Sequence, residues 1–374
     1  MMTLWERSVA LRLSVGASVL LVLVAGCGRS TDARHPVGVR DDPFPLLLCW
    51  SLEPDGSPYL TAIRADGSAR RRVPGSEGAA GGMWHPSGRS IVFLREEGLY
   101  LYRLGAPAPV PLDTNGRVIG RLAGFADGSK VVFSWGRRHP TEWYFATDGV
   151  SILDTESGAV DDLLVRESVI TAAAVSRDGA YVAFGDDTRA LAVIDLAKHR
   201  MTRELVALDG RHRVAGISWS PDGRFVAFVP HGILFDLQPS SIWVYDTLER
   251  SSERLFEGSR ECDVGTLVWH PTGSRLAFTW IEIESERPKK THLCMARPTG
   301  STWSVSEVLA VDGLLTLGGW SHDSQSFAYS MTRGSSSHIY VCAADLSEAR
   351  AISPPEARDY VPAWQPKRQL GGVP

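Results

Sequence analysis

The sequence has little cysteine and no excess of basic residues. Five cysteines occur among 374 residues, and none forms a Cys-x-x-Cys pair. Four of them lie far apart in the chain, so separately buried thiols are expected rather than disulfides: Cys49, Cys262, Cys294 and Cys342. The formal net charge of -4 provides no basic surface for phosphate groups, so nucleic acid is not expected among the partners.

Linear motifs for catalysis are absent as well. The sequence contains no G-x-S-x-G, no H-E-x-x-H, no G-x-x-x-x-G-K and no EF-hand loop. His85 and His270 stand inside a recurring turn sequence, where a turn residue is expected rather than a metal ligand. The sequence therefore predicts no catalytic residue, no metal site and no cofactor.

An export signal is expected at the N-terminus. The apolar run "LSVGASVLLVLVAG" follows Arg7 and Arg12 and ends directly before Cys27. The run is too short to span a bilayer as a mature helix. Its closing "VLVAGC" resembles the lipobox of bacterial lipoproteins, which implies cleavage before Cys27 and a diacylglyceryl group on its thiol. We therefore expect a signal peptide at residues 1–26 and a lipid anchor at Cys27.

A flexible tether is expected to follow the anchor. Residues 27–43 are polar after the lipidated cysteine and are interrupted by glycine and proline, so they have no apolar face to bury. Fully extended, this segment reaches roughly 50 Å. Gly28 stands where an aspartate would imply retention at the inner membrane, so the periplasmic side or the surface of the outer membrane is favoured in an organism with two membranes.

One phrase recurs along the remaining chain. It reads "WSPDGRFVAF" from Trp219 to Phe228, and its relatives are "WHPSGRSIVF", "GFADGSKVVF", "VSRDGAYVAF", "WHPTGSRLAF" and "WSHDSQSFAY". The turn glycines Gly88 and Gly128 are 40 residues apart, and Gly128 and Gly179 are 51 apart. A period of this length, built from short strands and turns, is typical of the blade of a β-propeller.

Each repeat is expected to contain four strands. In the copy around Trp219, alternating apolar residues and turn chemistry predict strands at 214–219, 224–229, 241–246 and 254–256. The chain before Trp84 supplies three strands without a first, and "YVPAW" after Asp359 supplies a first strand alone. Joining them completes a seventh blade and leaves no exposed sheet edge at the closure.

We therefore predict an all-β fold, a single seven-bladed β-propeller of four-stranded blades over residues 44–366, with a C-terminal tail at 367–374. Six blades are the alternative, because one of the weaker repeats could be irregular. The innermost strands are rich in small residues, as a crowded axis requires. The Trp that ends such a strand is expected to pack between neighbouring blades rather than contact a ligand: Trp84, Trp219, Trp269, Trp320 and Trp364.

These phrases, together with "IWVYD" and "YLTAIRADGS", resemble the TolB-like β-propeller repeat, a relative of WD repeats. The resemblance covers nearly the whole chain after the tether, and it implies the fold far more strongly than a function. TolB itself has an α/β domain before a six-bladed propeller and no lipid anchor. This chain is therefore expected to be TolB-like but not TolB.

Long insertions between the second and third strands are expected to gather on one face. Irregular, aromatic and charged loops on a rigid scaffold are common binding surfaces. In the second blade, "GRRHPTEWYFATDG" offers aromatic contact area and arginines for an acidic partner group. The candidate binding patch is Arg137, Arg138, His139, Trp143 and Tyr144. An equally weighted alternative is that the aromatic rings fold back over the blade and the arginines are solvated.

The sequence thus predicts a membrane-tethered propeller that binds or scaffolds envelope proteins. The main alternative is a propeller enzyme, a lyase or hydrolase acting on a saccharide or peptide, with residues from separate blades at the channel mouth: His139, His231, His292 and Asp236. A small-ligand sensor is a third possibility. The charges from Glu282 to Lys290 are expected to form a solvated hairpin tip. A hydrogen-bonded polar cluster at the mouth would favour the enzyme, and a broad aromatic surface would favour a protein partner.

Overall fold

The computed structural model describes residues 46–96, 98–138, 145–165, 170–186, 190–198, 200–207, 212–232, 240–259, 262–285, 287–300 and 302–366. Within these ranges the chain consists of strands and their connections, and no helix is long and apolar enough to cross a membrane. The expected signal peptide, the anchor Cys27, the tether and the tail lie outside the described residues and stay predictions.

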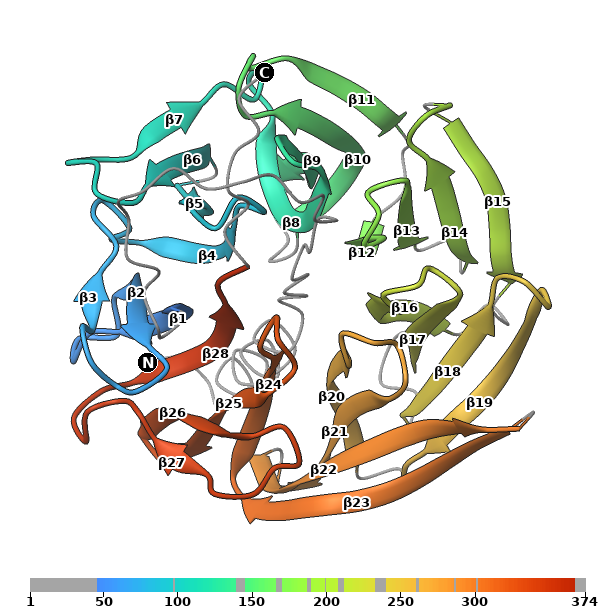
Figure 1. Ribbon diagram of the computed structural model, residues 1–374. Helices are drawn as coiled ribbons and strands as arrows, with labels where there is room; N and C mark the ends of the chain where they lie inside the picture. Colours follow the sequence, from blue (N-terminus) through green and yellow to red (C-terminus); the bar gives the residue numbers. More distant parts are fainter. Residues whose placement is uncertain are drawn as a thin grey trace, which may run out of the picture.

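The described strands form seven four-stranded antiparallel sheets around a common axis, the blades of a propeller (Figure 1). Six blades follow one another in the chain. From axis to rim, blade 1 contains β4 (Ala79–Trp84), β5 (Ser90–Arg95), β6 (Gly98–Arg103) and β7 (Val110–Leu112). Blade 2 contains β8 (Val118–Asp127), β9 (Lys130–Arg138), β10 (Phe145–Asp154) and β11 (Val160–Val165). Blade 3 contains β12 (Ile170–Val175), β13 (Tyr181–Asp186), β14 (Ala190–Asp195) and β15 (Arg200–Ala207).

Blades 4 to 6 repeat the same order. Blade 4 contains β16 (His212–Trp219), β17 (Phe225–Gly232), β18 (Ser241–Asp246) and β19 (Ser251–Glu257), and blade 5 contains β20 (Cys262–Trp269), β21 (Leu276–Glu284), β22 (Arg287–Thr299) and β23 (Thr302–Asp312). Blade 6 contains β24 (Leu314–Trp320), β25 (Ser326–Arg333), β26 (Ser336–Ala343) and β27 (Arg350–Ala351). The four strands predicted around Trp219 correspond to β16–β19, with ends that differ by a few residues.

Blade 7 joins the two ends of the propeller. Its order from the axis is β28 (Asp359–Trp364), β1 (Leu46–Leu52), β2 (Pro58–Arg64) and β3 (Arg71–Arg72). The C-terminal strand β28 pairs antiparallel with β1, with Leu47 opposite Trp364 and Ser51 opposite Asp359. The prediction of seven blades closed by the C-terminal strand is therefore confirmed, and the six-bladed alternative is wrong.

A buried polar cluster lies where blade 7 meets blade 6. The carboxylate of Asp359 is fully buried and accepts hydrogen bonds from Arg70 Nη2 (2.8 Å), Ser51 Oγ (2.7 Å) and Ser353 Oγ (2.8 Å). Ser337 Oγ donates to the main-chain carbonyl of Asp359 at 2.8 Å. A buried carboxylate is tolerated only when it is paired and hydrogen-bonded. These five residues, the closure cluster, connect segments from both ends of the chain.

Six of the seven described blades have a large buried side chain in the second strand, five residues after the turn glycine or, in blade 6, after Ser324. Phe residues occupy this position in five blades and are fully buried: Phe93, Phe133, Phe184, Phe228 and Phe278. Tyr329 takes the place in blade 6, and strand register puts Cys49 there in blade 7. Burying such a side chain contributes about 1.5–3 kcal/mol. The repeated sequence phrase therefore marks an equivalent position in the core of each blade.

The remaining cysteines are thiols without a disulfide. Cys49, Cys294 and Cys342 are buried, whereas Cys262 is half-buried and its Sγ lies 3.0 Å from Ser259 Oγ. Burial raises the pKa of Cys294 and of Cys342 to about 11. These thiols therefore stay protonated at neutral pH and pack as small apolar groups.

Tryptophan side chains join neighbouring blades. The indole Nε1 of Trp219 donates to the carbonyl of Ala174 in blade 3 at 3.1 Å, and three others donate in the same way to the preceding blade: Trp269 to Ser218, Trp84 to Ala363 and Trp364 to Gly319. We call each such contact an indole clasp. Trp320 differs, because its Nε1 lies 3.4 Å from Ala344 of its own blade while its ring packs edge-on against His270 of blade 5.

Candidate functional site

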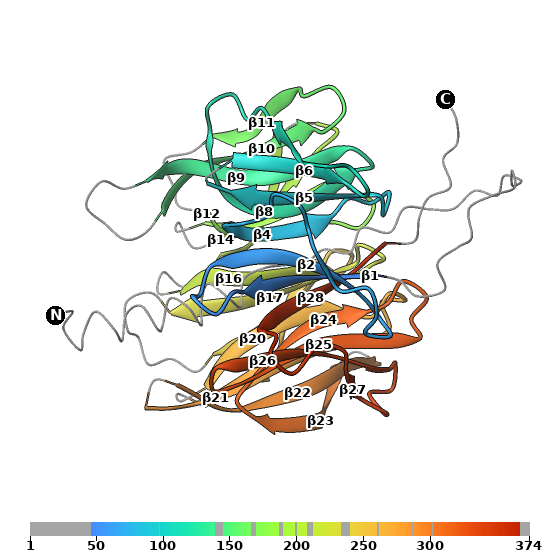
Figure 2. The same ribbon diagram turned by 90° about the vertical axis from the view of Figure 1, so that its left-hand side faces the viewer.

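Two long hairpins project from one face of the ring. They are β9–β10 of blade 2 and β21–β22 of blade 5, and both reach past the other strands on the left-hand side of Figure 2. The two blades lie on opposite sides of the axis (Figure 1). We call this side the hairpin face. The opposite side, the turn face, carries the short turns from first to second and from third to fourth strands.

Two of the five residues of the predicted binding patch belong to the described strand β9. Arg137 and Arg138 are the last two residues of β9 and pair with the first residues of β10. His139, Trp143 and Tyr144 lie outside the described residues. The backbone register thus places the two arginines on the hairpin face, and the patch as a whole stays a prediction.

A polar and aromatic cluster holds the base of β9–β10. Trp135 Nε1 donates to Ser151 Oγ at 2.6 Å, and Ser151 Oγ donates to Asp162 Oδ1 at 2.5 Å. Arg117 Nη2 donates to Asp162 Oδ2 at 2.9 Å, and its guanidinium lies 5.2 Å from the centre of the Trp135 ring. These residues come from β9, β10, β11 and the connection before β8. Their contacts therefore fix the hairpin to the rest of its blade.

A second cluster holds the base of β21–β22. The Trp280 ring stacks on the His292 ring with centroids 3.8 Å apart and planes 2° apart. His292 Nε2 lies 3.0 Å from Glu282 Oε1, and Nδ1 lies 2.7 Å from Glu307 Oε2. The His292 ring is therefore held between two carboxylates and one aromatic face.

The two clusters share a sequence signal that the sequence analysis did not single out. The phrases "VVFSW" and "LAFTW" place Trp135 and Trp280 two residues after the buried Phe133 and Phe278. Residues i and i+2 of a strand share one face of the sheet. Each Trp therefore extends the apolar face of its blade along the projecting hairpin, and these two blades have the longest described hairpins.

The tip of β21–β22 carries exposed charges. Lys289 Nζ donates to Glu284 Oε1 at 2.9 Å, and the two side chains are 53% and 64% exposed. This pair fits the expected solvated tip. Glu282 differs from that expectation, because its carboxylate belongs to the His292 cluster.

The residues proposed for an enzyme site are not brought together by the described structure. His139 and Asp236 lie outside the described residues, and the side chain of His231 is likewise undescribed. His292 faces Glu282 and Glu307 of its own blade. Among the described side chains, no group of three His, Cys, Asp or Glu could hold a metal ion.

The closure cluster also lies toward the hairpin face. It is built at the start of β28 and the end of β1. Ser51, Ser337 and Asp359 are each 0% exposed, so the hydrogen-bonding capacity of the cluster is used inside the blade junction. It acts in closing the ring and is not open to a substrate.

Comparison with known proteins identifies the fold. No family model and no curated protein matches the sequence. Among solved structures, an oligogalacturonate lyase in complex with manganese has a TM-score of 0.60 at 15% identity, covering 81% of this chain and 86% of the lyase. The oligogalacturonate lyase of Vibrio parahaemolyticus has a TM-score of 0.58 at 13% identity, covering 80% and 91%.

TolB from Acinetobacter baumannii has a TM-score of 0.52 at 15% identity, covering 86% of this chain and 67% of that protein. At such identities the likeness concerns the fold alone. The chain therefore has a TolB-like propeller fold with seven blades and is not TolB itself.

Proposed function

We propose that the protein is a membrane-tethered module of the bacterial envelope that binds or scaffolds other envelope proteins through its hairpin face. The observation that carries this proposal is the pair of long hairpins, which project from the same face on opposite sides of the axis (Figures 1 and 2). Two separated contact points on a rigid ring suit a partner broad enough to touch both.

The chemistry of the hairpins supports binding rather than simple solvation. Each hairpin is fixed at its base by a hydrogen-bonded cluster that includes a Trp, so the described part of each hairpin is held firmly on its blade. A preorganised contact surface loses less conformational entropy on binding. The sequence from Arg137 to Tyr144 contains arginine and aromatic residues, which are residue types enriched at protein interfaces.

The tether supports the location of the proposed activity. Lipid attachment at Cys27 would hold the ring at a membrane, and residues 27–43 would allow it to stand up to roughly 50 Å away. A ring held in this way searches for partners in a thin layer next to the membrane, which raises the effective concentration for a membrane-associated partner.

The proposal is tested by affinity capture from crosslinked envelopes. The intact protein is compared with a variant whose residues 137–144 are replaced by a short Gly-Ser turn and with a variant whose tip at residues 284–287 is replaced likewise. The control replaces exposed Leu248 and Glu249 on the turn face by serine. One protein recovered with the intact and control forms, and lost with both hairpin variants, is the expected result. No specific recovery with any form would overturn the proposal.

A second candidate is a propeller enzyme, and the likeness to two oligogalacturonate lyases is its support. The purified protein is incubated with oligogalacturonate and manganese, and unsaturated products are recorded by their ultraviolet absorbance. Turnover that is lost on replacing His231 by alanine would favour the enzyme. No product above the background of heat-denatured protein would leave the binding module as the better proposal.

A further inference from the structure

One boundary between blades lacks the aromatic side chain that fills the others. In every blade, strand register places one residue near the end of the first strand opposite a buried apolar residue near the start of the second strand. In blade 4 this residue is Trp219, opposite Val226, and in blade 3 it is Val175, opposite Val182. Blade 2 has Phe125, which packs edge-on against His85 of blade 1 at 5.0 Å, as Trp320 does against His270. Only blade 3, among the seven described blades, has an aliphatic residue there.

A groove of about 410 Å³ lies at this boundary, between blades 2 and 3 on the turn face. Its floor is apolar and is formed by Ala126, Ile152, Leu163 and Leu196, all members of the buried cluster that also contains Val175. A volume of this size is within the range of pockets that bind small organic groups.

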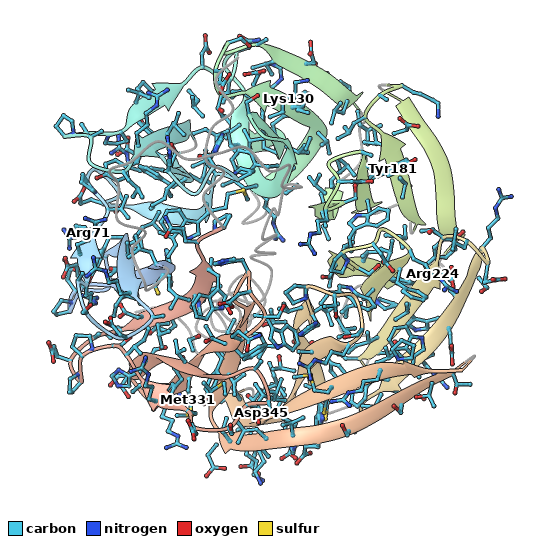
Figure 3. The ribbon with its side chains drawn as sticks, in the orientation of Figure 1. Arg71, Lys130, Tyr181, Arg224, Met331 and Asp345 are labelled. Atoms are coloured by element: carbon cyan, nitrogen blue, oxygen red, sulfur yellow. The ribbon has the colours of Figure 1, made fainter. Side chains whose placement is uncertain are left out.

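The groove is lined by a residue whose equivalent is covered by an indole at neighbouring boundaries. At neighbouring boundaries the anchor Trp stacks on the first residue of the previous blade's second strand: Trp219 on Tyr181 at 6.3 Å and Trp269 on Phe225 at 6.0 Å. The equivalent residue in blade 2 is Lys130. In strand register it lies opposite Asp154, as Tyr181 lies opposite Asp195 in blade 3. Lys130 lines the groove, and Figure 3 labels it on blade 2 beside Tyr181 on blade 3.

The groove cannot close by movement of the blades toward each other. Gly179, in the first turn of blade 3, has a φ of 69° and lies so close to the carbonyl of Ala126 that a side chain there would overlap it. The backbones of the two blades are therefore already in contact at this point. The groove stays open because small residues meet beside it and no large side chain fills it.

The rim of the groove is more acidic than basic. Asp154 and Asp161 line it together with Lys130. Main-chain N–H groups of Ser157 and Glu156 donate to the Asp154 carboxylate at 3.1 and 2.8 Å, and these bonds hold its pKa below its usual range. Because the rim carries two carboxylates and one ammonium group, it favours a ligand with a positive charge next to the part that enters the groove.

We propose that this groove binds an aromatic side chain, of the size of an indole, that a partner polypeptide presents next to a basic residue. The molecule itself supplies the precedent, because tryptophan fills the equivalent place at other boundaries between its blades. The proposal rests on the proposed function in assuming a protein partner, and it adds a second contact site on the face opposite the hairpins.

The probe is the peptide Gly-Lys-Trp-Lys-Gly with 5-fluorotryptophan, titrated into the purified full-length protein and followed by fluorine NMR. Binding to the wild type is expected. Val175→Trp is expected to extend an indole from the buried cluster into the groove and should weaken binding at least tenfold. Ala197→Arg, at an exposed turn that lines the groove, should do the same without a change in the core. A peptide with alanine in place of tryptophan should not bind.

Charge is tested separately. Asp161→Asn removes an exposed rim charge and should weaken binding of the lysine peptide about two- to fivefold. Binding of the matched peptide Gly-Ala-Trp-Ala-Gly should not change. An equal effect on both peptides would overturn the role of the basic neighbour.

Three results would overturn the site itself. The first is no binding of the peptide at about 1 mM, and the second is equal binding by the wild type and both groove variants. The third is binding of free indole as tightly as the peptide, which would make the groove a small-molecule pocket. The hairpin variants should bind the peptide like wild type. Failure of the groove is thereby distinguished from failure of the hairpin face, which is measured by capture from envelopes.

Discussion

The closure at blade 7 and the boundary between blades 2 and 3 are built in opposite ways. Two indole clasps flank blade 7, Trp364 to Gly319 and Trp84 to Ala363, and the buried Asp359 adds a charged cluster. The boundary between blades 2 and 3 has Val175, small residues and a groove. Blades 2 and 3 are adjacent in the chain, whereas blade 7 is closed by noncovalent contacts between distant segments. The blade that joins the two ends of the chain thus has a clasp on each side and a buried ion pair, whereas the described residues at the boundary between blades 2 and 3 include no indole clasp.

The largest expected effect comes from removing a clasp at the closure. Trp364→Ala deletes a buried ring and its hydrogen bond to Gly319, which should lower the free energy of unfolding by about 3–5 kcal/mol. Urea denaturation followed by far-ultraviolet circular dichroism measures the change. Val175→Ala is the matched control at the other boundary and should cost clearly less, because a smaller side chain is lost. Equal losses would remove the contrast between the two regions.

A somewhat smaller loss is expected from Asp359→Asn. The substitution keeps the shape of the side chain but leaves Arg70 without its charged partner. Breaking a buried ion pair costs about 3–5 kcal/mol, and because Arg70 is 27% exposed we expect about 2–3 kcal/mol. Glu257→Gln, in the exposed pair with Arg254, is the control and should cost less than about 1 kcal/mol. A loss at Asp359 no larger than this control would show that the closure cluster is not a stabilising element.

A pH-dependent effect is expected at the boundary between blades 1 and 2. Burial, followed by the nearby Arg103, lowers the pKa of His85 to about 4. Since the folded protein disfavours the protonated ring relative to an unfolded histidine near pH 6.5, this stability is present above about pH 6.5 and is lost as the pH falls toward 4. His85→Asn should reduce the loss of stability between pH 7 and 4.5 by about 1–2 kcal/mol.

The matched measurement for this pH effect is thermal unfolding of the wild type and of His85→Asn across the same pH series. The boundary between blades 2 and 3 offers no counterpart, because Ala126 stands where blade 1 has His85. Parallel curves for the two proteins would contradict the assignment to His85.

The smallest effect is expected from filling the groove. Val175→Trp would extend a ring from the buried cluster toward the groove, and cavity-filling substitutions typically stabilise by about 0.5–2 kcal/mol. We expect a gain near about 1 kcal/mol in urea denaturation. Val182→Trp, at a fully buried position of the same cluster, is the control and should destabilise by overpacking. A loss for Val175→Trp as large as for this control would show that the groove does not fit an indole.

The sequence predicts the fold well because its signals are local and repeated. Pro-Asp-Gly turns and alternating strands define blades such as β16–β19 without knowledge of distant contacts. Ring closure is also predictable, since one end of the chain lacks a first strand and the other end has one to spare. Asp359, by contrast, reads as an ordinary polar residue before "YVPAW", because Ser51 and Arg70 come from the other end of the chain.

The candidate sites are predicted less completely, for two physical reasons. The lost tryptophan of "VSRDGAYVAF" is visible in the sequence, but the groove depends on Val175, Ala126 and Gly179 all being small at one boundary, which only packing reveals. The bases of the hairpins depend on partners across a sheet, such as Glu307 for His292. The phrases "FSW" and "FTW" were the available signal for these, whereas the tip from Arg137 to Tyr144 remains a prediction.

The place of β1 in blade 7 also determines how the ring carries a mechanical load. If the tether holds the protein at a membrane, a pull on the propeller enters the fold at Leu46, the first residue of β1. This strand is hydrogen-bonded to β28 on one side and to β2 on the other. An edge strand can be peeled from one neighbour, but β1 leaves only when two ladders break together. The closure that completes the ring therefore also makes its point of attachment resistant to force.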